Sequence, residues 1–167
     1  LSKTSSMIKN NLIKDFLVFF LIFLLDRISK IYVVYLEKIN LNSEIFSSKF
    51  LNIYLIWNKG IAFGFFSFNE KNLYNGLTFL ILLIIFIIFY MAIRSSGLKK
   101  YSLLMILGGA LGNTFDRIFY KAVPDFIDFH IQDFHWFIFN VADIFITIGV
   151  IFMIMLEFVK SNNNKKI

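Results

Sequence analysis

Residues 71–94, with the sequence KNLYNGLTFLILLIIFIIFYMAIR, decide the fold class of this chain. No charge interrupts this stretch between Lys71 and Arg94, and it is long enough to cross a hydrocarbon core of roughly 30 Å as a helix. The whole chain shares its character: 58% of the residues are hydrophobic, 19% are aromatic, and the mean hydropathy is +0.72. These values lie outside the range of soluble domains and indicate a membrane protein.

Three more segments extend this pattern on both sides of the predicted helix 72–93. Residues 136–157 carry no charge between Asp143 near their start and Glu157 at their end, whereas residues 14–36 and 101–119 contain several charged side chains. Those charges must face protein or water, because lipid does not solvate them. The prediction is four transmembrane helices in a single domain that takes up the 167 residues.

Lysine and arginine residues are concentrated in three places: before the first predicted helix, between the second and third, and after the fourth. These places share one side of the membrane, which the positive-inside rule makes cytoplasmic, so both termini are expected there. The net charge of +6 is explained by this bias and by contact with membrane lipids, and nucleic-acid binding is not expected.

The first connection that faces outward, residues 40–68, resembles a sheet more than a simple loop. Residues 50–57 are rich in Phe, Leu, Ile and Tyr, and Asn58 and Gly60 supply turn residues after them. The predicted fold class is therefore an all-α membrane protein with a small extracytoplasmic β-sheet between the first and second helices. An amphipathic interfacial segment without a sheet is the alternative.

The chain has no cysteine and two histidines, so disulfides, thiol nucleophiles and thiolate metal sites are excluded. His130 and His135 could bind a metal or act as a base, but no nucleophile motif accompanies them. The expectation is that there is no metal site and no cofactor.

Polar residues gather where the third predicted helix ends and the fourth begins. Asn113 precedes Asp116 by three residues, and Asn140 precedes Asp143 by three residues. In a helix this spacing places the amide and the carboxylate on one face, where they could form a polar clamp between helices or part of a site. Asp116 is expected to pair with the neighbouring Arg117.

Asp125 lies in the apolar segment AVPDFI, residues 122–127, without a basic neighbour, and such surroundings favour the protonated acid. If Asp125 met Asp143, the two carboxyls would share one proton and could serve as general acid and general base in peptide hydrolysis. Asp128 and Asp133 lie in more polar stretches and are interpreted as solvated charges.

Five sequence blocks, in this order, resemble lipoprotein signal peptidase (signal peptidase II), an intramembrane aspartyl protease of peptidase family A8 with four transmembrane helices. The blocks are DRISK at 26–30, NKGIAF at 58–63, GGALGNTFDR at 108–117, VPDF at 123–126 and FNVAD at 139–143. Each block alone is a weak signal, but their joint order is specific. Pro124 and Arg27 depart from the residues that this family usually has, valine and glutamine.

The resemblance implies that Asp125 and Asp143 are the catalytic dyad. It implies that substrate-binding or site-supporting residues are Asn58, Gly60, Asn113, Asp116, Arg117 and Asn140. Asp26 and Lys30, four residues apart, are expected to form a structural ion pair within the first helix. The implied reaction is cleavage of bacterial prolipoproteins before a diacylglyceryl-modified cysteine, at the outer face of the inner membrane, by a monomer that globomycin inhibits and that needs no cofactor.

The residues leave two other functions open. A small ion- or proton-coupled transport protein would also contain intramembrane acids, but its acids should be spread through the bilayer. Here Asp116, Asp125, Asp128 and Asp143 are all predicted near the outer end. A scaffold protein whose polar pairs only lock helices together would leave the two outward-facing motif blocks unexplained.

Overall fold

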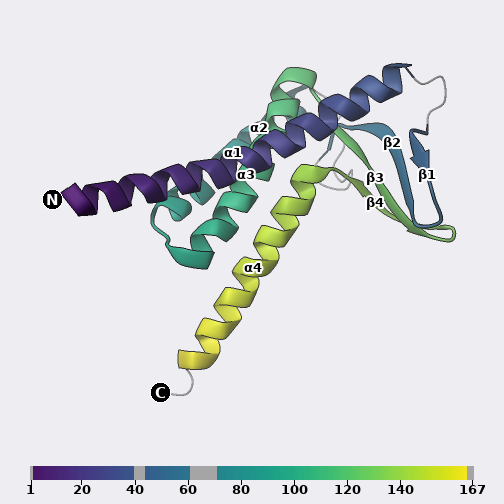
Figure 1. Ribbon diagram of the computed structural model, residues 1–167. Coiled ribbons are helices and arrows are strands. Elements are labelled where there is room, and N and C mark those ends of the chain that lie inside the picture. The colour runs from purple at the N-terminus through teal and green to yellow at the C-terminus, as the bar shows by residue number, and fades with distance from the viewer. Residues whose placement is uncertain (1, 40–43, 61–70, 165–167) are drawn as a thin grey trace.

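The computed structural model describes residues 2–39, 44–60 and 71–164, which form four helices and one four-stranded sheet. The helices are α1 Ser2–Ile39, α2 Lys71–Ile93, α3 Gly97–Tyr120 and α4 Val141–Asn164. The strands are β1 Phe46–Ser47, β2 Leu51–Asn58, β3 Val123–Ile131 and β4 Phe134–Phe139. Figure 1 shows the sheet at one end of the helices, near the end of α1 and the start of α4.

Helix α3 is the centre of the helical part, since it packs against α1, α2 and α4. Its glycines make these contacts close: a Cβ on Gly108 would meet the side chain of Ile22 in α1, and one on Gly109 would meet the backbone of Ala142 in α4. The small residues thus let two helices approach α3 at the same level. This level is where the polar residues of the chain converge.

Two of the described helices, α2 over Asn72–Ile93 and α4 over Val141–Ser161, are long and apolar enough to cross a membrane. Their outer faces are strongly apolar, and Phe79 and Phe158 are 71% and 69% exposed. Such exposed apolar faces require apolar surroundings, which a bilayer supplies. The full set of four spanning helices stays a prediction, because α1 and α3 carry charged residues in their interiors.

The sheet is built from two separate connections, and this corrects its predicted location between the first two helices alone. Strands β1 and β2 lie between α1 and α2, but β3 and β4 lie between α3 and α4 and complete the antiparallel order β1-β2-β3-β4. The remainder of the predicted region 40–68, at residues 40–43 and 61–68, lies outside the described residues. Pairing of β2 with β3 joins segments that no local pattern connects.

The predicted start of the fourth helix at residue 136 is wrong. Residues 136–139 belong to β4, and α4 begins at Val141. The sequence FHWFIF of β4 is rich in aromatic residues, which favour strands, but a continuous apolar run does not distinguish a strand from a helix by hydropathy. The difference matters because it places Asp143 in the first turn of α4.

The tight contact between α3 and α4 supports a stability prediction for Gly109→Ala. The added Cβ would lie 2.5 Å from the Ala142 carbonyl oxygen and 2.9 Å from Cγ1 of Ile146, so α4 must shift. We expect this overpacking to destabilise the protein by about 1–3 kcal/mol. The measurement is thermal unfolding of the purified protein in detergent.

The matched control is Gly76→Ala in α2, where an added Cβ would meet nothing within 4 Å among the described residues. Alanine is favoured over glycine in helices by about 1 kcal/mol, so this control should unfold at the same temperature as the unchanged protein or slightly higher. An unfolding temperature of Gly109→Ala as high as that of Gly76→Ala would contradict the packing argument.

Candidate active site

Asp125 lies in β3 and is 3% exposed, with both carboxylate oxygens hydrogen-bonded. Nδ2 of Asn58 donates to one oxygen at 2.8 Å, and Nδ2 of Asn140 donates to the other at 2.6 Å. Asn58 is the last residue of β2, and β2 pairs with β3 directly beside it, so sheet pairing positions this donor. Pro124 fits in β3 because at this position the strand pairs with β2 alone.

Asp143 is held by the start of α4. The Asp143 backbone N–H donates to Oδ1 of Asn140 at 3.2 Å, and the Asn140 N–H donates to Oδ2 of Asp143 at 3.2 Å. This reciprocal pair is a capping box with Asn140 as the N-cap residue. The other Asp143 oxygen, Oδ1, accepts a hydrogen bond of 2.8 Å from Nδ2 of Asn113 in α3.

Asn140 therefore connects the two acids, since its amide nitrogen binds Asp125 while its amide oxygen and backbone bind Asp143. Burial, and then the negative charge of Asp143, raise the pKa of Asp125 from 3.8 to about 6. The hydrogen bonds from Asn58 and Asn140 oppose this shift in pKa. Two coupled carboxyls of this kind can hold one proton between them close to neutral pH.

An apolar cavity of about 270 Å³ opens beside Asp143 along α4. It is lined by Trp136, Phe139, Asp143, Ile144, Thr147 and Ile148. An apolar peptide segment could occupy this cavity with its backbone close to the carboxylate. The combination of a carboxyl pair and an apolar groove is suited to hydrolysis of a bond in an apolar peptide.

A buried ionic cluster lies next to the acids and joins α1 to α3. It consists of Asp26, Arg27, Lys30 and Asp116, none of which is more than 9% exposed. Lys30 Nζ lies 2.9 Å from Asp26 and 2.8 Å from Asp116, while the guanidinium of Arg27 donates to both oxygens of Asp116 at 2.6 and 2.7 Å. The predicted pairing of Asp26 with Lys30 is confirmed, and the cluster is neutral overall.

This cluster reaches the catalytic candidates through two hydrogen bonds. Lys30 Nζ donates to Oδ1 of Asn113 at 2.7 Å, which orients the amide whose nitrogen binds Asp143. Oδ1 of Asp26 accepts the Ala142 backbone N–H at 3.1 Å, an amide that otherwise has no partner within its helix. A carboxylate at this position also complements the positive end of α4.

Arg117 does not pair with Asp116, which corrects the predicted clamp between these neighbours. Adjacent helical residues point in different directions, and Asp116 binds Arg27 and Lys30 instead. The Arg117 side chain donates to the Gly60 carbonyl oxygen at 2.5 Å, and the Gly60 N–H donates to Oδ1 of Asn58 at 2.8 Å. Arg117 thus supports the segment from which Asn58 reaches Asp125.

Two side chains have surroundings that differ from those predicted from the sequence. Asp128 was expected to be a solvated charge, but it is fully buried in β3, whereas Asp133 is exposed as expected. Arg27, which departs from the family pattern, binds both oxygens of Asp116 through its two terminal guanidinium nitrogens. A second basic residue in an apolar segment was the signal that pointed to a buried partner.

The site residues predicted from the sequence thus lie in one hydrogen-bonded network. The profile of the family described as Signal peptidase (SPase) II matches residues 18–159. A lipoprotein signal peptidase of Pelagibacter ubique (strain HTCC1062) is 47% identical over 156 residues, which are 93% of each chain. One of Anaplasma phagocytophilum (strain HZ) is 41% identical and covers 84% of this chain and 89% of the relative.

Two solved structures, each described as a bacterial membrane enzyme, have the same fold. One aligns with a TM-score of 0.70 and 27% identity over 91% of both chains. The other aligns with a TM-score of 0.71 and 26% identity over 86% of this chain and 91% of the other.

Proposed function

We propose that this chain, which belongs to the signal peptidase II family and is a lipoprotein-processing hydrolase of the bacterial inner membrane, cleaves prolipoproteins before a diacylglyceryl-modified cysteine. In this proposal Asp125 and Asp143 form an aspartyl dyad. One observation carries the proposal: Asn140 binds both carboxyls, and one of them borders an apolar cavity. No metal or covalent intermediate is needed for this chemistry.

In the proposed mechanism the two acids divide the proton transfers. Asp125, whose pKa is raised to about 6 by burial and by the charge of Asp143, holds the shared proton and donates it to the scissile carbonyl oxygen. Asp143 accepts a proton from the attacking water. The tetrahedral intermediate then collapses as the C–N bond breaks and a proton passes to the leaving nitrogen, which releases a carboxylate and the amino group of the modified cysteine.

The proposed orientation puts this reaction at the outer face of the membrane. Figure 1 shows that the N-terminal part of α1 and the C-terminal part of α4 point away from the sheet. Lysines are frequent in both terminal regions, and the positive-inside rule then places the termini in the cytoplasm and the sheet outside. A signal peptide lying in the membrane would reach the dyad beside the first turn of α4.

The experiment is cleavage of a diacylglyceryl-modified prolipoprotein by the purified full chain in detergent. The matched control substrate is the same prolipoprotein without the lipid on its cysteine, and globomycin serves as an inhibitor control. We expect cleavage directly before the modified cysteine, and none of the unmodified substrate. Intact lipidated substrate after incubation with folded protein would refute the proposal.

A pH prediction follows from the hydrogen bond between Asn58 and Asp125. This bond stabilises the ionised carboxylate and so lowers its pKa. In Asn58→Ala the pKa of Asp125 should therefore rise by about one unit. Cleavage stops at high pH when the shared proton is lost, so this fall in activity should occur about one pH unit higher in the variant. The measurement is the pH profile of cleavage rate.

The matched control for this profile is Asn52→Ala, six residues earlier in β2 and opposite Asp128 instead of Asp125. Its profile should overlay that of the unchanged protein. An Asn58→Ala profile that is unshifted, or shifted to lower pH, would show that Asp125 does not carry the shared proton.

A further inference from the structure

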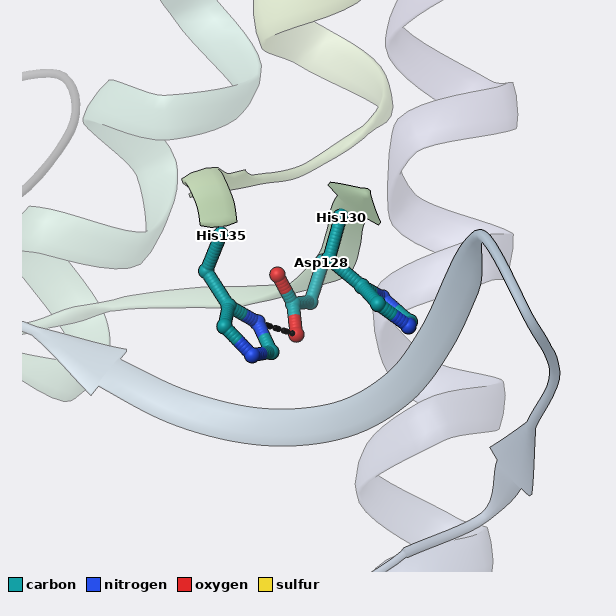
Figure 2. A group of neighbouring side chains, drawn as sticks. All are labelled: Asp128, His130 and His135. Atoms are coloured by element: carbon teal, nitrogen blue, oxygen red, sulfur yellow. Dashed lines mark hydrogen bonds and ion pairs between the residues drawn. The ribbon is translucent and has the colours of Figure 1, made fainter. Parts of the chain in front are cut away.

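A second group of ionisable side chains lies on the β3–β4 hairpin, apart from the dyad. Asp128 and His130 are two residues apart in β3 and therefore project from the same face, and His135 in β4 is paired directly with His130. Figure 2 shows the three side chains gathered on this face, with the Asp128 carboxylate between the imidazoles. Asp125, three residues before Asp128, projects from the opposite face of β3.

The three side chains are close enough to share one ligand. One nitrogen from each histidine and one oxygen of Asp128 all lie within 4.8 Å of one another. Nδ1 of His135 lies 2.8 Å from Oδ2 of Asp128, and the two imidazole rings are stacked with their centroids 5.0 Å apart. The register shift between Asp128 and His130 adds one residue to β4 here, which aims His135 toward the group.

Two atoms of this group are buried without a hydrogen-bond partner among the residues that the structure describes. They are Oδ1 of Asp128, a residue that is fully buried, and Nδ1 of His130. Burying a polar atom without a hydrogen-bond partner is unfavourable, so native proteins rarely retain one without a role. Both atoms can offer lone pairs to a cation when the carboxylate is ionised and the His130 imidazole is neutral with its proton on Nε2.

We propose that Asp128, His130 and His135 bind a divalent transition-metal ion of the Zn²⁺ type. Two imidazoles and one carboxylate form a donor set that Zn²⁺ accepts, and three protein ligands leave a fourth position open to water. The His135 side chain is 51% exposed, which gives the ion a route to the otherwise buried carboxylate. The ion would join β3 to β4 and neutralise Asp128, and it does not enter the proposed peptide hydrolysis.

The composition of the chain makes the test selective. The two histidines are the only ones in the sequence, and cysteine is absent, so no other imidazole or thiolate competes. The full chain is purified without a polyhistidine tag, stripped with a chelator, and titrated with Zn²⁺ against a chromophoric chelator. We expect one Zn²⁺ per chain. Binding should be about 10–100-fold weaker or more in His130→Gln and in His135→Gln, because loss of a residue that only hydrogen-bonds a metal ligand already lowers metal affinity by that factor.

The matched control is Asp133→Asn, an exposed acid in the turn of the same hairpin, which should bind Zn²⁺ as the unchanged protein does. Asp125→Asn should also bind normally, which separates this inference from the proposed function. Zn²⁺ should raise the unfolding temperature of the unchanged protein but not of His135→Gln, whose exposed side chain is not needed for folding. Equal affinity in the histidine variants, or less than one ion per chain, would mean an adventitious ion only and overturn the proposal.

Discussion

Asp125→Asn and Asp143→Asn are each expected to reduce cleavage of a lipidated prolipoprotein by about 10²–10⁴-fold, because each removes one of the two proton transfers. An amide cannot accept the proton of water, and it cannot donate one as a carboxylic acid does. The double variant should be little worse than either single variant, since the two residues act as a unit. The measurement is the initial cleavage rate under conditions where the unchanged protein is saturated.

Asp133→Asn is the matched control for these variants, because it removes an exposed carboxylate from the same connection between α3 and α4 and leaves Asp125 and Asp143 in place. Its cleavage rate should equal that of the unchanged protein. Unfolding temperatures of all variants separate a catalytic loss from a folding loss. If Asp125→Asn retained activity within a few fold while folded, the catalytic assignment of Asp125 would be wrong.

Lys30→Met is expected to lower the stability of the protein by about 3–5 kcal/mol, the usual cost of removing one partner from a buried ionic group. Lys30 is 2% exposed and lies against both Asp26 and Asp116, which would then share the single charge of Arg27. The substitution also removes the donor that orients Asn113, so cleavage should fall as well. For a chain of this size the unfolding temperature should drop by about 10 °C.

The matched control is Lys100→Met, which breaks the ion pair between Lys100 and Asp15. The two side chains are 23% and 13% exposed, more than those of Lys30, Asp26 and Asp116, so the loss of this pair should cost less than the loss of Lys30. Equal unfolding temperatures for Lys30→Met and Lys100→Met would contradict the structural importance assigned to the cluster of Asp26, Arg27, Lys30 and Asp116.

Contacts that depend on strand pairing escaped prediction, as Asp128 and Asn58 illustrate. The polar surroundings of Asp128 in the sequence suggested solvation, but pairing of β3 with β2 and β4 buries it and brings His135 beside it. Asn58 was identified by resemblance alone, and only the pairing of β2 with β3 explains how it reaches Asp125. The ion pair of Asp26 with Lys30, by contrast, was predictable because both residues lie within one turn of the same helix.

What the sequence alone determined was local: the apolar runs of α2 and α4, the position of Asp143 near the start of a helix, and the order of motifs that identifies the family. These features depend on neighbours within a few residues, where helical periodicity and apolar length suffice. The tertiary structure alone decided that β2 pairs with β3, that Asn58 binds Asp125 and Asn113 binds Asp143, and that Arg27 and Lys30 both bind Asp116. Those contacts join segments far apart in the chain, and only packing of the whole domain brings them within hydrogen-bond distance.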